Sequence, residues 1–349
     1  MNSYERIIAA LSHKEADRVP VYPILSGITR KLVGATYKEW STNAEICAAA
    51  FIKSTEQFDI DCVVTLIDLS LECDAWGQKL IYSENEAAHP DYSDCVIKSL
   101  DDYAKIKKVD YRKSERMMMH IDVCHRLVKE LKGKKPIIAF VFGPLGILSM
   151  LRNQEAMFMD IYDDPDAVKA AEKEINETLK EYVAALCDTG VDAIMFDTLF
   201  ASGTIMSKKM WIEMESEFVK ELSEIVTEKG CLTMVHNCGQ KIYFDAQIEA
   251  MKPAAISFLY PPDDCEDFYE CKNKYGNITT LIGCVTPASA VLGTDEEWDS
   301  QCRNNIDAMA EGGGFILATG CEYPANASFS RAERMIEIAK TYGSYRAKT

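Results

Sequence analysis

The sequence contains only 5 histidines and no apolar run long enough to cross a membrane. A transmembrane helix needs roughly 20 consecutive apolar residues, and no stretch of the 349 residues approaches that length. The first residues, MNSYERIIAALSHKE, form a charged amphipathic pattern and lack the basic start and apolar middle of a signal peptide. The chain is therefore expected in the cytoplasm, with no membrane partner.

Positive charge is also scarce. The chain has 38 Lys and Arg residues against 55 Asp and Glu residues, which gives a formal net charge of −17. Nucleic-acid binding depends on basic stripes that meet the phosphate backbone, and the sequence has none. We therefore expect no nucleic-acid partner. Hydrophobic and charged contents of 48% and 27% are typical of a globular protein.

Cysteine, in contrast, is abundant, with 13 residues. Most of them lie inside apolar runs, as Cys62, Cys187, Cys231 and Cys284 do, where a thiol packs as a small hydrophobe. The odd count and this placement argue against a secreted disulfide framework. They indicate a reducing compartment.

Short apolar or β-branched runs recur along the chain and predict eight strands. They are 18–24, 61–67, 136–142, 191–197, 231–237, 254–259, 279–285 and 314–319. Helical patterns, with apolar residues three and four apart, separate successive runs. This alternation predicts a parallel sheet covered by helices, and the count of eight favours a closed (β/α)8 TIM barrel. An open doubly wound sheet is the alternative.

Two segments extend this α/β barrel. One is an extra N-terminal helix ahead of the first strand, and the other is an insertion at 68–112, between the second strand and its helix. The sequence shows no linker, low-complexity tract or clear internal repeat, so residues 1–349 are expected to form a single domain.

Function in such barrels resides at the carboxyl ends of the strands. The residues predicted there are Asp68, Gly143, Asp197, His236, Cys238, 283–287 and Cys321. Asp197 could orient a ligand or could only cap the following turn. Of two further polar residues, Glu322 is expected to be solvated and His120 to lie on a helix surface.

The stretch CLTMVHNCGQ raises the possibility of a metal site. His236 and Cys238 are two apart, so their side chains point to one side of an extended segment, and Gly239 allows the chain to bend. Cys321 leaves the eighth strand toward the same face. Two thiolates and one imidazole favour zinc with an open fourth position. Alternatively, the three are ordinary residues, since a His-x-Cys pair alone is a weak signal.

The chain also carries a set of longer motifs in order, namely ERIIAALSHKEADRVPVYP, VVTLIDLSLECDAWG, FVFGPLGILSM, AIMFDTLFAS, VHNCG, IGCVTP and ILATGCEYP. This set, which covers nearly the whole chain, resembles the uroporphyrinogen decarboxylase superfamily, and within it the corrinoid-dependent methyltransferases. The resemblance implies zinc on His236, Cys238 and Cys321, and methyl transfer that involves a corrinoid (cobalamin).

The chain also departs from the decarboxylase branch of this superfamily at several positions. The resemblance implies that decarboxylases have an arginine-rich N-terminal loop and a histidine near the eighth strand. In this chain the corresponding N-terminal segment, PILSGITRKLVG, has only Arg30 and Lys31, and Cys321 stands in place of the late histidine. Asp68 aligns with the key aspartate of the decarboxylases. The methyltransferases keep an Asp–Glu pair there, which corresponds to Asp68 and Glu72, and these two could bind a polar group of the substrate.

The expected function is therefore a zinc-dependent methyltransferase that acts between a corrinoid and a small molecule, such as a thiol or a methylated ether or amine. The chain has no cobalamin-binding Asp-x-His-x-x-Gly pattern, so the corrinoid is expected on a partner protein. A uroporphyrinogen-type decarboxylase and a non-catalytic barrel that binds a metal or a corrinoid protein are the alternatives.

Overall fold

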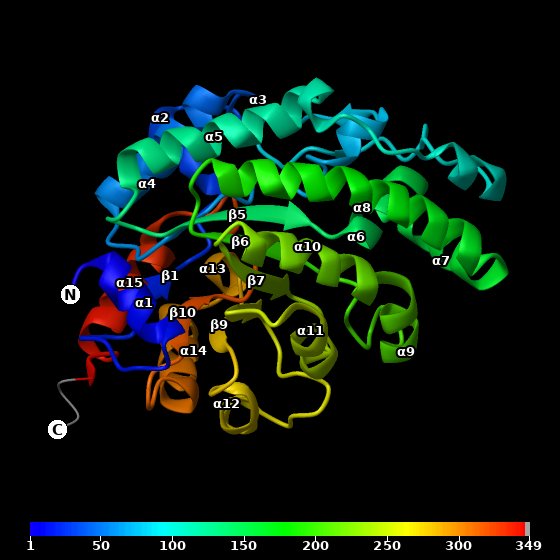
Figure 1. The fold of residues 1–349 in the computed structure, drawn as a ribbon. Helices are drawn as coiled ribbons and strands as arrows, with labels where there is room; N and C mark the ends of the chain where they lie inside the picture. The colour runs from blue at the N-terminus through cyan, green and yellow to red at the C-terminus, as the bar shows by residue number, and fades with distance from the viewer. Residues whose placement is uncertain (346–349) are drawn as a thin grey trace.

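A computed structural model describes residues 1–345, and its main sheet has eight parallel strands. In sheet order they are β1 (Val21–Tyr22), β10 (Phe315–Thr319), β9 (Thr280–Val285), β8 (Ala255–Phe258), β7 (Leu232–Asn237), β6 (Ala193–Asp197), β5 (Ile137–Phe142) and β2 (Val63–Val64). Helices surround the strands (Figure 1). The predicted (β/α)8 barrel is confirmed, and the open doubly wound sheet is wrong.

The barrel closes between β1 and β2 through one buried aspartate. The Asp61 amide donates to the Val21 carbonyl (2.9 Å), and its carboxylate accepts from the Val21 amide (2.8 Å). The same carboxylate binds Arg6 Nη1 at 2.6 Å and Arg18 Nη1 at 2.8 Å. Hydrogen bonds to the Asp61 side chain thus replace most of the regular strand pairing between β1 and β2.

Helices precede and follow the strands as the alternation predicts. They are α1 (Ser3–Leu11), α2 (Arg30–Val33), α3 (Tyr37–Thr42), α4 (Ala44–Gln57), α5 (Glu115–Leu131), α6 (Pro144–Arg152), α7 (Gln154–Asp163), α8 (Pro165–Asp188), α9 (Lys208–Trp211), α10 (Glu217–Glu228), α11 (Phe244–Met251), α12 (Phe268–Tyr275), α13 (Ser289–Leu292), α14 (Asp295–Met309) and α15 (Ser330–Thr341). Within residues 1–345, none is long and apolar enough to span a membrane.

Helix α5 illustrates why these segments are helical. The Ser114 hydroxyl accepts from the Met117 amide at 3.2 Å and caps the first turn. Met117, Ile121, Cys124 and Leu131 then recur at helical spacing and are buried. The amphipathic stripe therefore sets the helix against the sheet.

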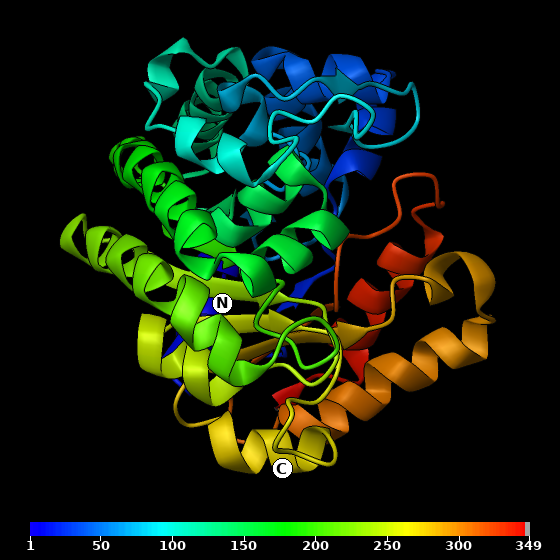
Figure 2. The same ribbon diagram turned by 90° about the vertical axis from the view of Figure 1, so that its right-hand side faces the viewer.

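The insertion after the second strand is confirmed. It contains an antiparallel hairpin of β3 (Leu80–Ile81) and β4 (His89–Pro90), with the short 3-10 helices η2 (Cys73–Trp76), η3 (Leu100–Lys105) and η4 (Tyr111–Lys113). It lies between β2 and α5, and therefore at the carboxyl end of the barrel. Figure 2 turns that end, toward which the β5 arrow points in Figure 1, to the viewer.

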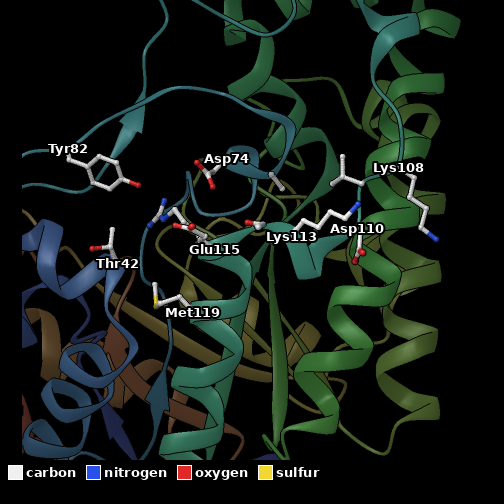
Figure 3. Close-up of a pocket in the computed structure, with 12 residues that line it drawn as sticks. Thr42, Asp74, Tyr82, Lys108, Asp110, Lys113, Glu115 and Met119 are labelled. Carbon is white, nitrogen blue, oxygen red and sulfur yellow. The ribbon is translucent and has the colours of Figure 1, made fainter.

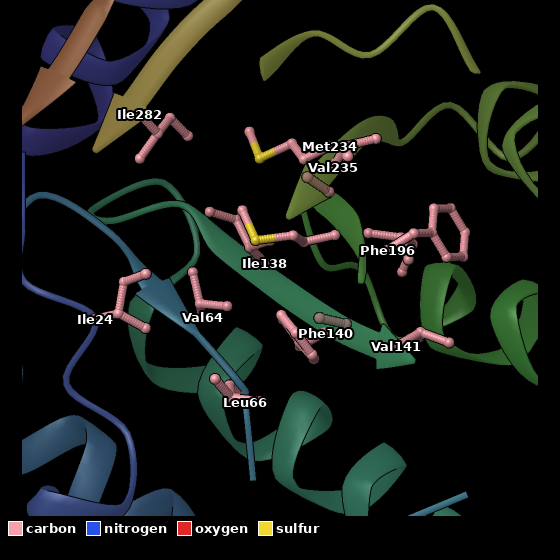
Figure 4. Close-up of a cluster of buried hydrophobic side chains, with 14 of the residues drawn as sticks. Ile24, Val64, Leu66, Ile138, Phe140, Val141, Phe196, Met234, Val235 and Ile282 are labelled. Atoms are coloured by element: carbon pink, nitrogen blue, oxygen red, sulfur yellow. The ribbon is translucent and has the colours of Figure 1, made fainter. Parts of the chain in front are cut away.

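The barrel interior is a packed apolar core. Alternate residues of the strands point inward, among them Val64 and Leu66, Ile138 and Phe140, and Met234 (Figure 4). The interior leaves a cavity of only about 20 Å³, which is about the space of one water. A substrate therefore has no room inside the barrel, and chemistry is confined to its rim.

Candidate functional site

The structure brings His236, Cys238 and Cys321 together at the rim. His236 is near the end of β7, Cys238 follows this strand, and Cys321 follows β10. Their candidate ligand atoms all lie within 4.8 Å of one another. The two strands, β7 and β10, are three places apart in the sheet, and the curvature of the sheet into a barrel brings their carboxyl ends together.

The chain bends after β7 as Gly239 was expected to allow. The Asn237 side chain accepts from the Gly239 amide (2.9 Å) and donates to the Thr198 carbonyl (2.7 Å), which fixes the bend. A Cβ atom at Gly239 would lie 2.4 Å from Ser202 Oγ. Only glycine fits this close approach, and the bend carries Cys238 back toward His236.

His236 is oriented by a neighbouring strand. Its Nδ1 lies 3.0 Å from Ser257 Oγ on β8, which leaves Nε2 for a further partner. Burial opposes protonation of His236, but the Cys321 sulfur and the Asp197 carboxylate together raise its pKa above the usual value. The Cys238 sulfur and burial raise the pKa of Cys321 well above that of a free thiol. One imidazole and two sulfurs at this spacing fit a zinc ion, whose charge would stabilise both thiolates.

Asp197 ends β6, directly beside His236 in the sheet register. It follows Met195, a residue of the barrel interior, by two positions, so its side chain also points inward. The residue is 4% exposed, and its Oδ1 has no hydrogen-bond partner among residues 1–345. Burial raises the pKa of Asp197 to about 6. An acceptor atom is therefore available at the rim.

Asp68 and Glu72 have different bonding partners. Both Asp68 oxygens bind the Arg116 guanidinium, and Oδ1 also accepts from the Ser70 hydroxyl at 2.7 Å. Glu72 accepts only from the Phe142 amide among other residues, at 3.3 Å, and burial raises its pKa to about 8. Asp68 is thus held in a buried ion pair, whereas Glu72 has no cationic partner.

Two expectations from the sequence are wrong. Glu322 is not a solvated residue, because its Oε1 accepts from the Gly27 amide at 3.0 Å and burial raises its pKa to about 7. His120 is fully buried, with Thr65 Oγ1 and Tyr182 Oη each 2.6 Å from a ring nitrogen. The surroundings of Glu322 and of His120 depend on contacts with segments distant in the chain, and sequence periodicity does not predict such contacts.

Glu215 was not among the site residues expected from the sequence. This residue lies on η5, a π-helical turn (Ile212–Ser216), and accepts from Trp211 Nε1 at 2.7 Å and from the Leu145 amide at 3.2 Å. Burial raises its pKa to about 7, and the nearby Asp197 charge contributes. A Cβ at Gly143 would lie 2.7 Å from Glu215 Oε1, so glycine is required there. A π-turn has no simple sequence signature.

Arg116 joins the rim to a cavity outside it. The cavity, of about 660 Å³, lies under the insertion and above the start of α5 (Figure 3), and its lining includes Asp74, Tyr82, Lys113 and Arg116. The guanidinium of Arg116 is 5% exposed, and its Nε has no partner. Sequence analysis missed this residue, since nothing in the α5 pattern points to Asp68.

The two cations of the N-terminal segment are held by loop atoms. Arg30 donates to the Ala325 carbonyl (2.9 Å) and to Asn326 Oδ1 (3.1 Å), and Lys31 donates to the Ala327 carbonyl (2.8 Å). They therefore tie the segment after β1 to the segment after β10. These bonds fix the positions of both side chains, and Lys31 uses one of its three N–H donors in them.

A second acidic group is explained by ion pairs. Asp245, Asp263 and Asp264 also bring oxygens within 4.8 Å of one another. Lys208 Nζ lies 2.9 Å from oxygens of both Asp245 and Asp263, and Lys274 Nζ lies 2.7 Å from Asp264. The two lysines bind all three carboxylates and balance two of the three negative charges, which accounts for the group without a metal ion.

Comparison with known proteins agrees with this fold. The family model described as "Uroporphyrinogen decarboxylase (URO-D)" matches residues 2–342. A curated uroporphyrinogen decarboxylase from Wolinella succinogenes is 22% identical over 205 residues, which is 57% of this chain and 57% of that protein. The chain thus aligns with a little over half of this relative's length.

Solved structures with the same fold include a methyltransferase from Methanosarcina mazei, with a TM-score of 0.78, 17% identity, and 98% and 99% of the two chains covered. A B12-independent methionine synthase from Shewanella sp. W3-18-1, solved with selenomethionine, gives a TM-score of 0.56 and 16% identity, with 95% and 98% covered. At this identity, the likeness shows a shared barrel and no more.

Proposed function

The chain belongs to the uroporphyrinogen decarboxylase family, and on this premise we propose that it is a zinc-dependent methyltransferase. It would move a methyl group between a corrinoid (cobalamin) on a partner protein and a small thiol or a methylated ether or amine. The observation that carries this proposal is the grouping of His236, Cys238 and Cys321 within 4.8 Å at the barrel rim. The Methanosarcina protein with the same barrel, which is a methyltransferase, agrees with it.

The residues of the chain have separate roles in this proposal. Nε2 of His236 and the sulfurs of Cys238 and Cys321 would hold the ion, and Ser257 fixes the histidine ring. Bound zinc supplies a Lewis acid that keeps a substrate thiol deprotonated or polarises the heteroatom of a methyl donor. Asp197 would orient the bound molecule with its free Oδ1. The closed interior keeps the substrate at the rim, where a partner protein has access.

Decarboxylation of a porphyrinogen is the less favoured activity. A substrate with many carboxylates needs several free cations. Arg30 and Lys31 are bound to loop atoms, and Arg116 is bound to Asp68. Near these side chains, Glu72, Asp197 and Glu322 would repel carboxylates when ionised.

The test is an optical assay with the full chain, purified without air and with its zinc content measured. Reduced cobalamin is mixed with methylated ethers and amines, and methylcobalamin is mixed with thiols. The proposal predicts protein-dependent changes in the cobalamin spectrum for one class of compound, and loss of these changes in Cys321→Ala. A zinc-loaded protein that is inactive with the whole panel favours the non-catalytic barrel. A protein without zinc that decarboxylates porphyrinogen contradicts the proposal.

A further inference from the structure

The rim of the barrel has carboxyl groups that no cationic side chain balances. We call Glu72, Asp197 and Glu322 the rim carboxyls. Glu72 contacts the last residue of β5, Asp197 ends β6, and Glu322 follows β10. None of the three forms an ion pair within the described residues, 1–345, whereas the neighbouring Asp68 is fully paired with Arg116. The rim is therefore negative when these carboxyls are ionised, and a bound cation would favour their ionised form.

Each cationic side chain near the rim is already bonded to a group other than the rim carboxyls. Arg116 has both terminal nitrogens on Asp68, and Arg30 and Lys31 bind main-chain carbonyls of the loop after β10. A zinc ion with two thiolates and a neutral imidazole has no net charge, so the proposed metal would not offset the rim carboxyls. Arg116 and Arg30 attract Glu72 and Glu322 only at a distance, without an ion pair, so a direct positive partner for the rim carboxyls has to come from a bound molecule or from protons.

Buried atoms without partners point to a ligand at the same place. Asp197 Oδ1 has none among residues 1–345, and the residue is 4% exposed. Ser26 Oγ also has none, is completely buried, and belongs to the residue before Gly27, whose amide holds Glu322. Buried polar atoms in folded proteins are normally satisfied. Two such orphans beside unpaired carboxyls are expected where a polar ligand completes the site.

Aromatic rings lie next to these groups. The Phe140 ring packs 5.9 Å from the His236 ring, and Tyr22 lines the same packed interior, which has no room for a ligand. Tyr22 is also close enough to Glu322 for the carboxylate charge to act on its hydroxyl. The rings therefore form an apolar floor below the rim, and in such surroundings the attraction between a carboxylate and a cationic group is stronger than in water, as is the repulsion of an anionic group.

We propose that the small-molecule substrate carries a positively charged nitrogen, which the rim carboxyls hold while its sulfur or methylated heteroatom faces His236, Cys238 and Cys321. This inference rests on the proposed function and adds the charge class of the substrate. The same ammonium group would suit either a methyl donor, such as a quaternary amine, or an acceptor, such as a thiol with a cationic nitrogen.

Three thiols of similar size and different charge test the inference by binding alone. The zinc of the full chain is replaced by cobalt(II), whose visible spectrum reports a bound thiolate. The protein is then titrated with thiocholine, 2-mercaptoethanol and 2-mercaptoethanesulfonate. Thiocholine is chosen because its quaternary nitrogen has no lone pair for the metal. We expect it to bind about tenfold more tightly than 2-mercaptoethanol, and 2-mercaptoethanesulfonate to bind most weakly.

Two variants and a competing cation test which carboxyls bind the positive charge of the ligand. Glu322→Gln and Asp197→Asn are each expected to reduce the preference for thiocholine at least threefold. Glu130→Gln, an exposed residue on α5 near its C-terminal end, removes the same charge and should leave the preference unchanged. Tetramethylammonium should compete with thiocholine, and the neutral tert-butanol should not.

The outcomes separate the two proposals. If cobalt binds and the three thiols have equal affinities, or the sulfonate binds best, the charge inference is wrong and the metal site stands. If cobalt does not bind, the proposed function fails together with this inference. If cobalt binds and no thiol changes its spectrum, the charge inference is wrong, and the optical assay with methylated ethers and amines still tests the proposed function. When thiocholine is preferred, incubation with methylcobalamin identifies it as an acceptor, and methylation of reduced cobalamin by choline identifies a donor.

Discussion

Nδ1 of His236 lies 3.0 Å from the hydroxyl oxygen of Ser257, on the adjacent strand β8. The contact orients the imidazole and occupies Nδ1, so Nε2 is the nitrogen left to bind an ion together with Cys238 and Cys321. A hydroxyl can accept from Nδ1–H, and it then supports the tautomer whose Nε2 lone pair is available to a metal. The relationship therefore connects the sheet register with the chemistry that we propose for the rim.

Removal of this hydroxyl should weaken zinc binding without unfolding the protein. We expect Ser257→Ala to lower the zinc affinity about 10- to 100-fold, because the ring loses its orienting partner. The affinity is measured by competition with a chromophoric chelator. Ser149→Ala, which removes a buried hydroxyl bonded to the Gly146 carbonyl on α6, is the matched control. Equal affinities in the two variants would contradict the role of Ser257.

Removal of either sulfur should have a larger effect. We expect Cys238→Ala and Cys321→Ala to fall from about one zinc per chain to almost none after dialysis, with circular dichroism unchanged. Cys265→Ala serves as the control, since Cys265 is also only partly buried and lies outside the group. Retention of zinc by both site variants would show that the ion, if present, binds elsewhere.

Some parts of the fold and of the site are predictable from the sequence and others are not. The eight strands and the insertion were predictable, because buried parallel strands are apolar runs of characteristic length. The neighbourhood of His236, Cys238 and Cys321 followed from strand exits and from family resemblance. Ser257 and Arg116 did not, since their roles come from register and from contacts between segments distant in the chain. Glu322 was misjudged, because only the folded loop after β1 supplies the Gly27 amide.

The closure of the barrel gives a prediction about stability. Asp61→Asn leaves Arg6 and Arg18 buried without their shared carboxylate, and breaking a buried ion pair in this way costs about 3–5 kcal/mol. Asp122→Asn is the control, because the Asp122 side chain is 49% exposed and pairs with Arg126 one turn further along α5, where a pair contributes less than about 1 kcal/mol. Urea unfolding measures both. Similar losses in the two variants would mean that Asp61 does not close the barrel.

The buried Glu72 predicts a pH dependence. Burial raises its pKa from 4.5 to about 8 in the folded protein, so the folded state retains a proton that the unfolded state releases. The stabilisation by this proton is complete below pH 4.5 and is lost as the pH rises through 8. Each pH unit in this window costs at most about 1.4 kcal/mol.

Metal-free protein is used for this measurement, because zinc binding also releases protons. The free energy of unfolding should fall less steeply between pH 5 and 8 in Glu72→Gln than in the parent protein. Glu130→Gln, at an exposed position, should retain the parent slope. Parallel curves for all three proteins would show that Glu72 is ionised throughout this range.

Anomalous diffraction at the zinc edge, from crystals grown with zinc supplied and air excluded, tests the central claim most directly. The account predicts one strong peak at the carboxyl end of the barrel, within bonding distance of His236 Nε2 and of the sulfurs of Cys238 and Cys321. A map without that peak, or with these three side chains directed apart while zinc is in excess, would contradict it.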